Sequence, residues 1–148
     1  MRIEEANAGD VKELKELIGR EFPYTGITEQ KVWDKIDNPF FMILKMAGGK
    51  GEMTGFAEFQ VMDAENGIAR LNGITVRPAF RGKGYSKKLL TGAVKKIREN
   101  GYKKIILLVK VKNRTAKKLY KGLGFVKVGT LGKLIDKDKI EEWELIII

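Results

Sequence analysis

The residues of this chain with the clearest chemical potential lie between positions 74 and 90, in the stretch ITVRPAFRGKGYSKKLL. An apolar segment of strand type runs into a loop with two glycines, Gly82 and Gly84, and a helical pattern follows at once. Glycine allows positive φ and lets the backbone approach a ligand closely. The first turn of a helix has amide donors without intrahelical partners and carries partial positive charge. The stretch therefore predicts a site for a phosphate or pyrophosphate group.

Taken alone, this glycine pair is a weak signal. It has neither the G-x-x-x-x-G-K-[ST] spacing of a P-loop nor the G-x-G-x-x-G spacing of a dinucleotide fold. A tight strand-to-helix turn without a ligand is the alternative interpretation. The basic residues Arg81, Lys83, Lys87 and Lys88 favour the anion site, because they place full positive charges around the loop.

The residue types that the chain lacks narrow the chemistry further. Its 148 residues include no Cys and no His. These absences exclude a disulfide framework, a thiolate metal site, a Cys nucleophile and every arrangement that needs an imidazole. Any catalysis must therefore use carboxylates, Tyr, Lys, hydroxyl groups or backbone amides, and we expect no bound metal.

Positive charge is concentrated in the second half of the chain. Between Arg77 and Lys133 there are 18 basic residues and a single acidic one, Glu99, whereas the remaining residues carry 11 basic and 18 acidic side chains. An asymmetry of this size suggests an anionic partner, such as a polyphosphate cofactor, a nucleic acid or an acidic membrane surface. A lysine-rich, solvated surface is the simpler alternative.

The hydrophobic periodicity predicts one mixed α+β domain over residues 1–148. Strands are expected over 2–6, 40–47, 53–62, 68–76, 103–111, 125–129 and 139–148. Helices are expected over 10–19, 28–36, 85–100 and 113–125. The three strands between 40 and 76 should form an antiparallel meander, because their connections are short. The apolar run at 103–111 looks like a strand buried on both faces.

The chain has no apolar run long enough to span a membrane and no signal peptide at its start. We therefore expect a cytoplasmic protein that does not interact with a membrane.

Two motifs together resemble the GNAT superfamily of acyl-CoA-dependent N-acyltransferases. The family's cofactor motif [RQ]-x-x-G-x-[GA] corresponds to residues 81–86, with Arg81, Gly84 and, as a small departure, Ser86 in the last place. About 30 residues downstream, the pattern N-x-x-A-x-x-L-Y-x-x-x-G-F is complete. Its residues here are Asn113, Ala116, Leu119, Tyr120, Gly124 and Phe125. The resemblance is strong over residues 68–126 and agrees with the predicted order of elements.

The resemblance implies a mostly antiparallel sheet of about seven strands flanked by about four helices, and acetyl-CoA as the cosubstrate. The backbone of the strand before the loop would pair with the pantetheine arm, and the loop amides would hold the pyrophosphate. Asn113 would contact the arm, and Tyr120 would protonate the leaving thiolate. The cofactor-binding residues implied in this way are Ile74, Thr75, Val76, Arg81, Gly82, Lys83, Gly84, Tyr85, Ser86, Asn113 and Tyr120.

Two of these residues also have simpler interpretations. Tyr120 could be a packing residue, and Asn113 could be a helix cap.

The residue that would deprotonate an acceptor amine is harder to find. Family members that act on histones carry a Glu where this chain has Arg70, and those that act on ribosomal proteins carry one where it has Leu108. Glu58, which interrupts an apolar run in an expected central strand, is the best remaining candidate for a catalytic base. An exposed or structural Glu58 is the alternative. Acidic residues in the first half (Glu21, Asp34 and Asp37) would favour a cationic acceptor.

We therefore interpret the sequence as an N-acetyltransferase that moves an acetyl group from acetyl-CoA directly to a primary amine of a protein, peptide or small molecule, as a monomer or homodimer. One alternative is a non-catalytic acyl-CoA-binding regulator on the same fold. The other is a small basic nucleic-acid-binding domain, although beyond non-specific contacts we expect no nucleic-acid partner, since no binding motif is present.

Overall fold

The structure is a computed structural model that describes all residues from Met1 to Ile148. The predicted order of strands and helices is confirmed. The strands are β1 (Arg2–Glu5), β2 (Phe41–Ala47), β3 (Met53–Asp63), β4 (Ile68–Val76), β5 (Lys104–Lys110), β6 (Val126–Thr130) and β7 (Ile140–Ile146). The helices are α1 (Val11–Glu21), α2 (Glu29–Ile36), α3 (Tyr85–Glu99) and α4 (Arg114–Gly122). None of the helices combines the length and the apolar character needed to cross a bilayer.

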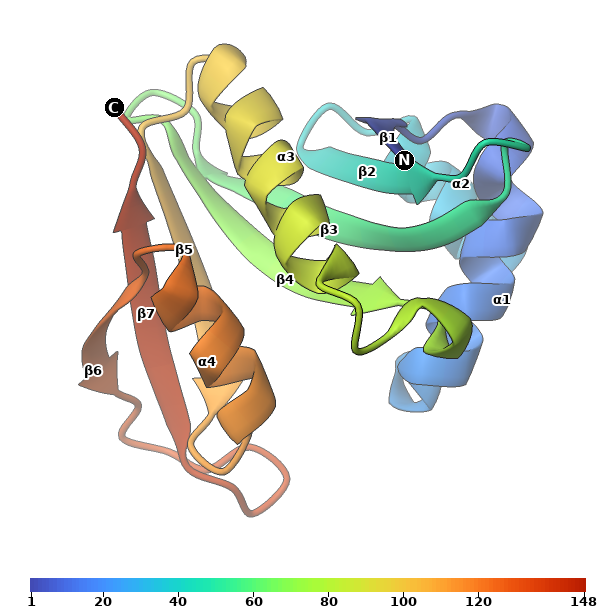
Figure 1. Ribbon diagram of the computed structural model, residues 1–148. Coiled ribbons are helices and arrows are strands. Elements are labelled where there is room, and N and C mark those ends of the chain that lie inside the picture. The colour runs from blue at the N-terminus through green and yellow to red at the C-terminus, as the bar shows by residue number, and fades with distance from the viewer.

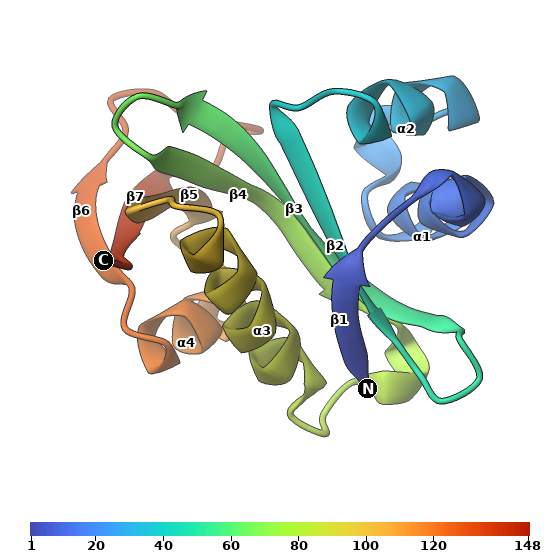
Figure 2. The same cartoon turned by 90° about the horizontal axis from the view of Figure 1, so that it is seen from above.

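All seven strands form one sheet in the order β1-β2-β3-β4-β5-β7-β6. Every neighbouring pair is antiparallel except β4 and β5, which are parallel. Helices α3 and α4 lie on one face of the sheet, and α1 and α2 lie on the other, over its β1–β3 half (Figure 1; Figure 2). This architecture confirms the predicted α+β class with a mostly antiparallel sheet.

Each face of the sheet has its own apolar core. The larger core lies under α3 and α4 and includes Leu89 and Leu90 of α3 with Phe59 of β3. The smaller core lies under α1 and α2 and includes Leu14, Leu17, Val32 and Phe56. These are the residues that the 3.6-residue and two-residue periodicities place on the inner faces of helices and strands.

The β4–β5 pair is incomplete, and its open end positions the site. The two strands pair from Ile68 opposite Lys104 as far as Leu71 opposite Leu107, and not beyond. In Figure 1 the β3–β4 arm and the β5–β7 arm diverge from this point. On its other edge, β4 remains paired with β3 up to Val76, with an irregularity at Asn72. The backbone of residues 72–76 therefore has no strand neighbour on its β5 side.

The structure corrects two details of the sequence-based prediction. Helix α1 runs through Gly19 to Glu21 and ends before Pro23, because burial of Leu17 and Ile18 outweighs the roughly 1 kcal/mol that an internal glycine costs a helix. Strand β5 is buried on one face only, and Leu108 remains 40% exposed. Neither α1 nor α2 reaches far enough to cover that side of β5 (Figure 2).

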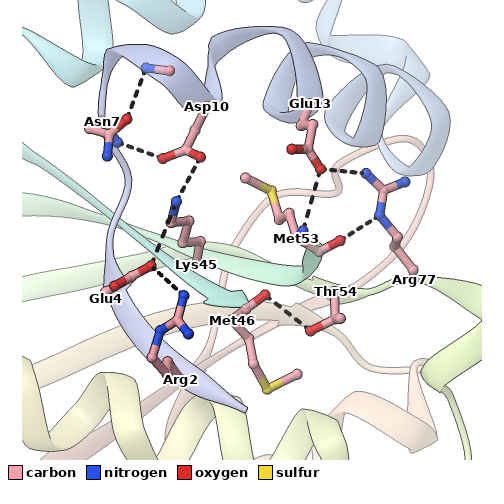
Figure 3. Close-up of polar contacts among 11 residues, drawn as sticks. Arg2, Glu4, Asn7, Asp10, Glu13, Lys45, Met46, Met53, Thr54 and Arg77 are labelled. Atoms are coloured by element: carbon pink, nitrogen blue, oxygen red, sulfur yellow. Dashed lines mark hydrogen bonds and ion pairs between the residues drawn. The ribbon is translucent and has the colours of Figure 1, made fainter. Parts of the chain in front are cut away.

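A network of polar contacts ties the start of α1 to the sheet (Figure 3). Lys45 Nζ lies 2.7 Å from Asp10 Oδ1, and both side chains are almost fully buried. Asp10 in turn accepts a hydrogen bond from the amide of Asn7. In a second, separate group of contacts, Arg77 donates to the carbonyl of Met53 at 2.7 Å and lies 3.6 Å from Glu13 (Figure 3). Because Arg77 is the first residue after β4, these contacts hold the point from which the glycine loop departs.

Candidate active site

The glycine loop before α3 presents a run of unused amide donors. The backbone N–H groups of residues 82–87 make no hydrogen bond within the protein, and the first bond of the helix runs from Lys88 to the carbonyl of Gly84. Gly82 and Gly84 adopt φ values of +75° and +80°, and an added Cβ at either would meet open space. Alternating backbone conformations of this kind form a concave anion-binding nest. The anion site stays a prediction, for which this loop offers the amide donors.

The loop is anchored by the first residue of its motif. Arg81 Nε donates to the carbonyl of Val76 at 2.9 Å, and its Nη2 atom lies 2.6 Å from Glu21 Oε2. The Arg81 charge is thus neutralised by the end of α1. By contrast, Lys83, Lys87 and Lys88 form no ion pair and are exposed. These three lysines, rather than Arg81, supply the free positive charge beside the nest.

A cavity of about 790 Å³ connects the loop with the gap between β4 and β5. Its walls include most of the residues implied by the resemblance, namely Ile74, Thr75, Val76, Arg81, Gly82, Ser86, Asn113 and Tyr120. Three of the residues implied by the resemblance do not line it. Lys83 and Gly84 are exposed, and the ring of Tyr85 packs against Phe80 at 5.8 Å between centroids. The volume and elongated lining suit a long cosubstrate with an anionic end.

Tyr120 lies on α4 with its ring in the core and its hydroxyl at the cavity. The residue is only 8% exposed, and its ring packs 5.7 Å from that of Phe125. No buried side-chain nitrogen or oxygen in the structure lacks a partner, yet the Tyr120 hydroxyl bonds to no protein group, so it is open to the cavity that it lines. Burial raises its pKa to about 12. The phenol is therefore fully protonated at neutral pH and available as a donor.

Asn113 forms the N-cap of α4, as its simpler interpretation suggested. Its Oδ1 atom accepts a hydrogen bond from the amide of Ala116 at 3.1 Å. Its Nδ2 group makes no hydrogen bond to the protein, and the residue lines the cavity. The two interpretations are compatible, because capping uses the oxygen and leaves the amide nitrogen for a ligand.

A second cavity of about 370 Å³ lies on the opposite side of the β4–β5 gap, beneath α1 and α2. It shares Phe22, Tyr24, Asn72, Gly73 and Leu108 with the large cavity. The two cavities therefore meet where β4 and β5 separate. Two molecules that entered from opposite faces of the sheet would come into contact at this junction, as a group transfer between them requires.

Glu58 lies on β3 in the wall of this second cavity and is 6% exposed. Its Oε1 atom is 2.9 Å from Lys35 Nζ, and its Oε2 atom accepts a hydrogen bond from Asn72 Nδ2, also at 2.9 Å. The carboxylate is therefore neither exposed nor isolated. It is the single acidic side chain in the lining of the second cavity.

The acidic residues expected to attract a cationic acceptor are not gathered there. Glu21 is paired with Arg81, and neither Asp34 nor Asp37 lines the second cavity. The structure also has no group of three or more acidic side chains placed to hold a metal ion.

Sequence reasoning missed the residues at the junction of the two cavities. Asn72 and Gly73 form the irregular step in β4, where Glu58 pairs with Gly73 and Phe59 pairs with Leu71. An Asn-Gly pair inside a strand pattern is a signal for a bulge, and it was available in the sequence. Phe22 and Tyr24 carried no comparable signal, because a loop's position relative to a sheet is set by packing far away in sequence.

Comparisons with known proteins agree with this geometry. The profile described as the acetyltransferase (GNAT) family matches residues 11–125. A [ribosomal protein bS18]-alanine N-acetyltransferase of Haemophilus ducreyi is 40% identical over 57 residues, which are 38% of this chain and 39% of that relative. This sequence match therefore spans about two fifths of the relative's length.

Solved structures resemble the whole chain in fold. The spermidine N-acetyltransferase from Vibrio cholerae in complex with CoA and spermine superposes with a TM-score of 0.84 at 20% identity, covering 98% of this chain and 94% of that one. The ribosomal-protein-S18-alanine N-acetyltransferase from Escherichia coli has a TM-score of 0.80 at 22% identity, covering 99% of this chain and 93% of that one.

The matched residues include both motifs, strands β2 to β5 and every lining residue of the smaller cavity. The family profile bears out the predicted class of enzyme, which takes its acetyl group from acetyl-CoA. On the strength of that match, this chain belongs to the acetyltransferase (GNAT) family.

Proposed function

We propose that the protein transfers an acetyl group from acetyl-CoA directly to a primary amine that enters from the opposite face of the sheet. The observation that carries this proposal is the meeting of the two cavities at the β4–β5 gap. The large cavity ends at the amide nest, which suits the CoA pyrophosphate. The free edge of residues 72–76 would pair with the pantetheine arm and direct the thioester towards the junction.

Tyr120 is proposed as the group that assists departure of the thiolate. The acceptor nitrogen attacks the thioester carbonyl, the C–N bond forms, the C–S bond breaks, and the sulfur leaves with the electron pair. A phenol with a pKa of about 12 donates a hydrogen bond to the developing thiolate. A thiol has a pKa near 8.5, well below that of Tyr120, so the proton stays on the phenol and the thiolate leaves as a hydrogen-bonded anion that takes up any proton from water.

Glu58 is proposed as the proton acceptor on the amine side. An ammonium group must lose a proton before it attacks, and Glu58 is the acidic group that the second cavity offers. Two of the roughly four acceptor positions of its carboxylate are used by Lys35 and Asn72, which leaves capacity for the amine or for a bridging water. A purely structural role, in which Glu58 holds Lys35 against the sheet, is the rival explanation.

The test is release of free CoA thiol from acetyl-CoA in the presence of a panel of amines and amino-terminal peptides. We expect release above the rate of spontaneous hydrolysis, with acetyl-CoA binding visible by calorimetry. If acetyl-CoA binds but no amine raises thiol release, the protein is a non-catalytic acyl-CoA binder. If acetyl-CoA does not bind, the assignment of the amide nest is wrong.

Glu58→Gln distinguishes the two roles of that residue. If Glu58 is the proton acceptor, kcat/KM for the amine falls most at low pH, where the acceptor is protonated. If it only anchors Lys35, the variant lowers thermal stability while the shape of the pH profile stays unchanged.

A further inference from the structure

We infer that the acceptor of this enzyme is an aminocarboxylate, that is, a primary amine with a carboxylate a short distance from the reacting nitrogen, and that Arg70 recognises the carboxylate. The inference rests on the proposed acetyl transfer and specifies its acceptor. It starts from the charges that line the smaller cavity, which are Lys35, Glu58 and Arg70.

These three charges do not cancel. Lys35 and Glu58 form an ion pair at 2.9 Å. Arg70 forms no ion pair with any carboxylate of the chain, so the cavity keeps one unbalanced positive charge. Arg70 is only partly buried, and a carboxylate ligand would form with it the ion pair that the chain does not supply. A polyamine acceptor would bring further positive charge to this site, whereas a carboxylate would complete it.

Arg70 is held in place for such a contact. Its Nε atom donates to Asn72 Oδ1 at 2.8 Å, and its Nη2 atom donates to Gln60 Oε1 at 3.1 Å. Both acceptors are neutral amide oxygens, so they orient the guanidinium without neutralising it. A guanidinium has five N–H donors, and these bonds use two of them. The remaining donors, including both on Nη1, are free to bind a carboxylate.

The place of Arg70 on β4 limits the size of the acceptor. Arg70 is three residues before Gly73, the point on β4 where the two cavities meet. At ~3.3 Å per residue, this separation is roughly 10 Å along the strand. A fully extended peptide of about three residues spans that distance. The Arg70 side chain shortens this separation, because its Nε atom lies 2.8 Å from Oδ1 of Asn72, which lines both cavities. The carboxylates within reach are therefore those of a free amino acid or of one of the first residues of an acidic peptide.

The rest of the cavity wall agrees with a small amphiphilic acceptor. It is formed by apolar side chains from both faces of the gap, including Ile18, Phe22, Phe56 and Leu108. These side chains can cover the methylene groups of the acceptor but offer no counter-charge. Specificity for charge in this cavity thus depends on Arg70.

The experiment compares matched acceptors that differ in the carboxylate alone. Thiol release from acetyl-CoA is measured with an amino acid and its carboxamide, with an acidic tripeptide and its neutral counterpart, and with spermidine. We expect kcat/KM, expressed per unprotonated amine, to be about ten- to a hundredfold higher for the carboxylate member of each preferred pair, the range typical of a hydrogen-bonded charge. The amino-acid and tripeptide arms separate the two sources of the carboxylate.

Variants of Arg70 show whether this residue is responsible. Arg70→Gln should remove the preference within each pair, because it lowers kcat/KM for the carboxylate member more than for the carboxamide. Arg70→Lys should keep part of the preference, because it keeps the charge and loses the planar fork. Arg20→Gln is the matched control, since Arg20 is exposed on α1 and lines neither cavity. Equal use of both pair members by the wild type, a preference for spermidine, or an unaltered preference in Arg70→Gln overturns the inference.

A binding measurement tests the role of Arg70 without requiring the enzyme to turn over. An N-acetylated amino acid and its carboxamide are titrated by calorimetry into the protein saturated with CoA. Tighter binding of the carboxylate by the wild type, lost in Arg70→Gln, supports the inference even where no acceptor in the panel is acetylated. Equal or absent binding of both contradicts it. A complete lack of thiol release with every amine counts instead against the proposed acetyl transfer.

Discussion

The amide nest makes a quantitative prediction for Gly84. An Asp at this position must adopt the φ of +80° that glycine adopts in the structure. For an L-residue this left-handed conformation costs about 1–2 kcal/mol, so Gly84→Asp should lower the free energy of unfolding by that amount. The fold should survive, because nothing lies within 4 Å of the new Cβ.

The same substitution should weaken acetyl-CoA binding much more than it weakens the fold. The new carboxylate would stand beside a pyrophosphate held by the neighbouring amides. For an assumed separation of about 5 Å, repulsion by one phosphate charge is about 1–3 kcal/mol for effective dielectric constants between those of water and of a protein surface, or about 5- to 150-fold in Kd. The loss should shrink at high ionic strength, because the site is exposed.

Two further variants test whether a negative charge at position 84 is what weakens acetyl-CoA binding. Gly84→Asn has similar size and the same backbone demand without the charge, so it should show a smaller affinity loss that does not depend on salt. Gly101→Asp is the positional control, since Gly101 has a φ of +93° and open space around it at the other end of α3. It should lose similar stability and bind acetyl-CoA normally by calorimetry. Wild-type affinity in Gly84→Asp, or an equal loss in Gly101→Asp, would refute the assignment of the nest.

Three other predictions follow from described contacts. Tyr120→Phe should lower kcat, by up to about 10²–10⁴-fold for a lost general acid, with little change in KM for acetyl-CoA. In the wild type, the pKa of Tyr120 is about 12, so its ionisation should cause no alkaline loss of activity below pH 10.0. A hydrogen bond from the Trp143 indole, with smaller contributions from Lys127 and Lys117, holds the pKa of Glu141 below its ordinary value of 4.5. The Glu141 carboxylate therefore stabilises the fold above pH 4.5, and this stabilisation is lost as the pH falls. Urea unfolding at decreasing pH should show the loss in the wild type but not in Glu141→Gln. Asp10→Ala leaves Lys45 buried with only the Glu4 carboxylate near it, at 3.7 Å, and should lower the free energy of unfolding by about 3 kcal/mol, measured by chemical denaturation. Adding Lys45→Met to that variant should restore much of the lost stability.

Much of the fold could be predicted because local signals and packing agree. The strands and helices have clear two-residue or 3.6-residue patterns, and the glycine loop has a local motif whose backbone geometry follows from Gly82 and Gly84. The one-sided burial of β5 could not be predicted, because an apolar run does not reveal how far α1 and α2 extend over the sheet.

The acceptor side of the site was the hardest part to predict. In the sequence, Arg70 is distinguished only as the position where related enzymes carry a Glu. Its hydrogen bonds to the neutral side chains of Gln60 and Asn72 depend on the register between β3 and β4. Register is a property of two segments together. The same holds for Glu58, whose partner Lys35 comes from a helix 23 residues earlier in the chain.

The separation of β4 from β5 also affects the energetics of the free protein. Residues 72–76 of β4 and 108–110 of β5 forgo backbone hydrogen bonds that adjacent strands in a sheet normally share. Each such bond contributes about 0.5–1.5 kcal/mol net, so the unliganded protein gives up a few kcal/mol of possible stability to keep the groove open. The irregular step at Asn72 helps to prevent the two strands from closing along their length. A pantetheine arm that paired with this edge would act as a temporary strand of the sheet, and ligand at a hundred times its Kd would stabilise the whole fold by about 2.7 kcal/mol.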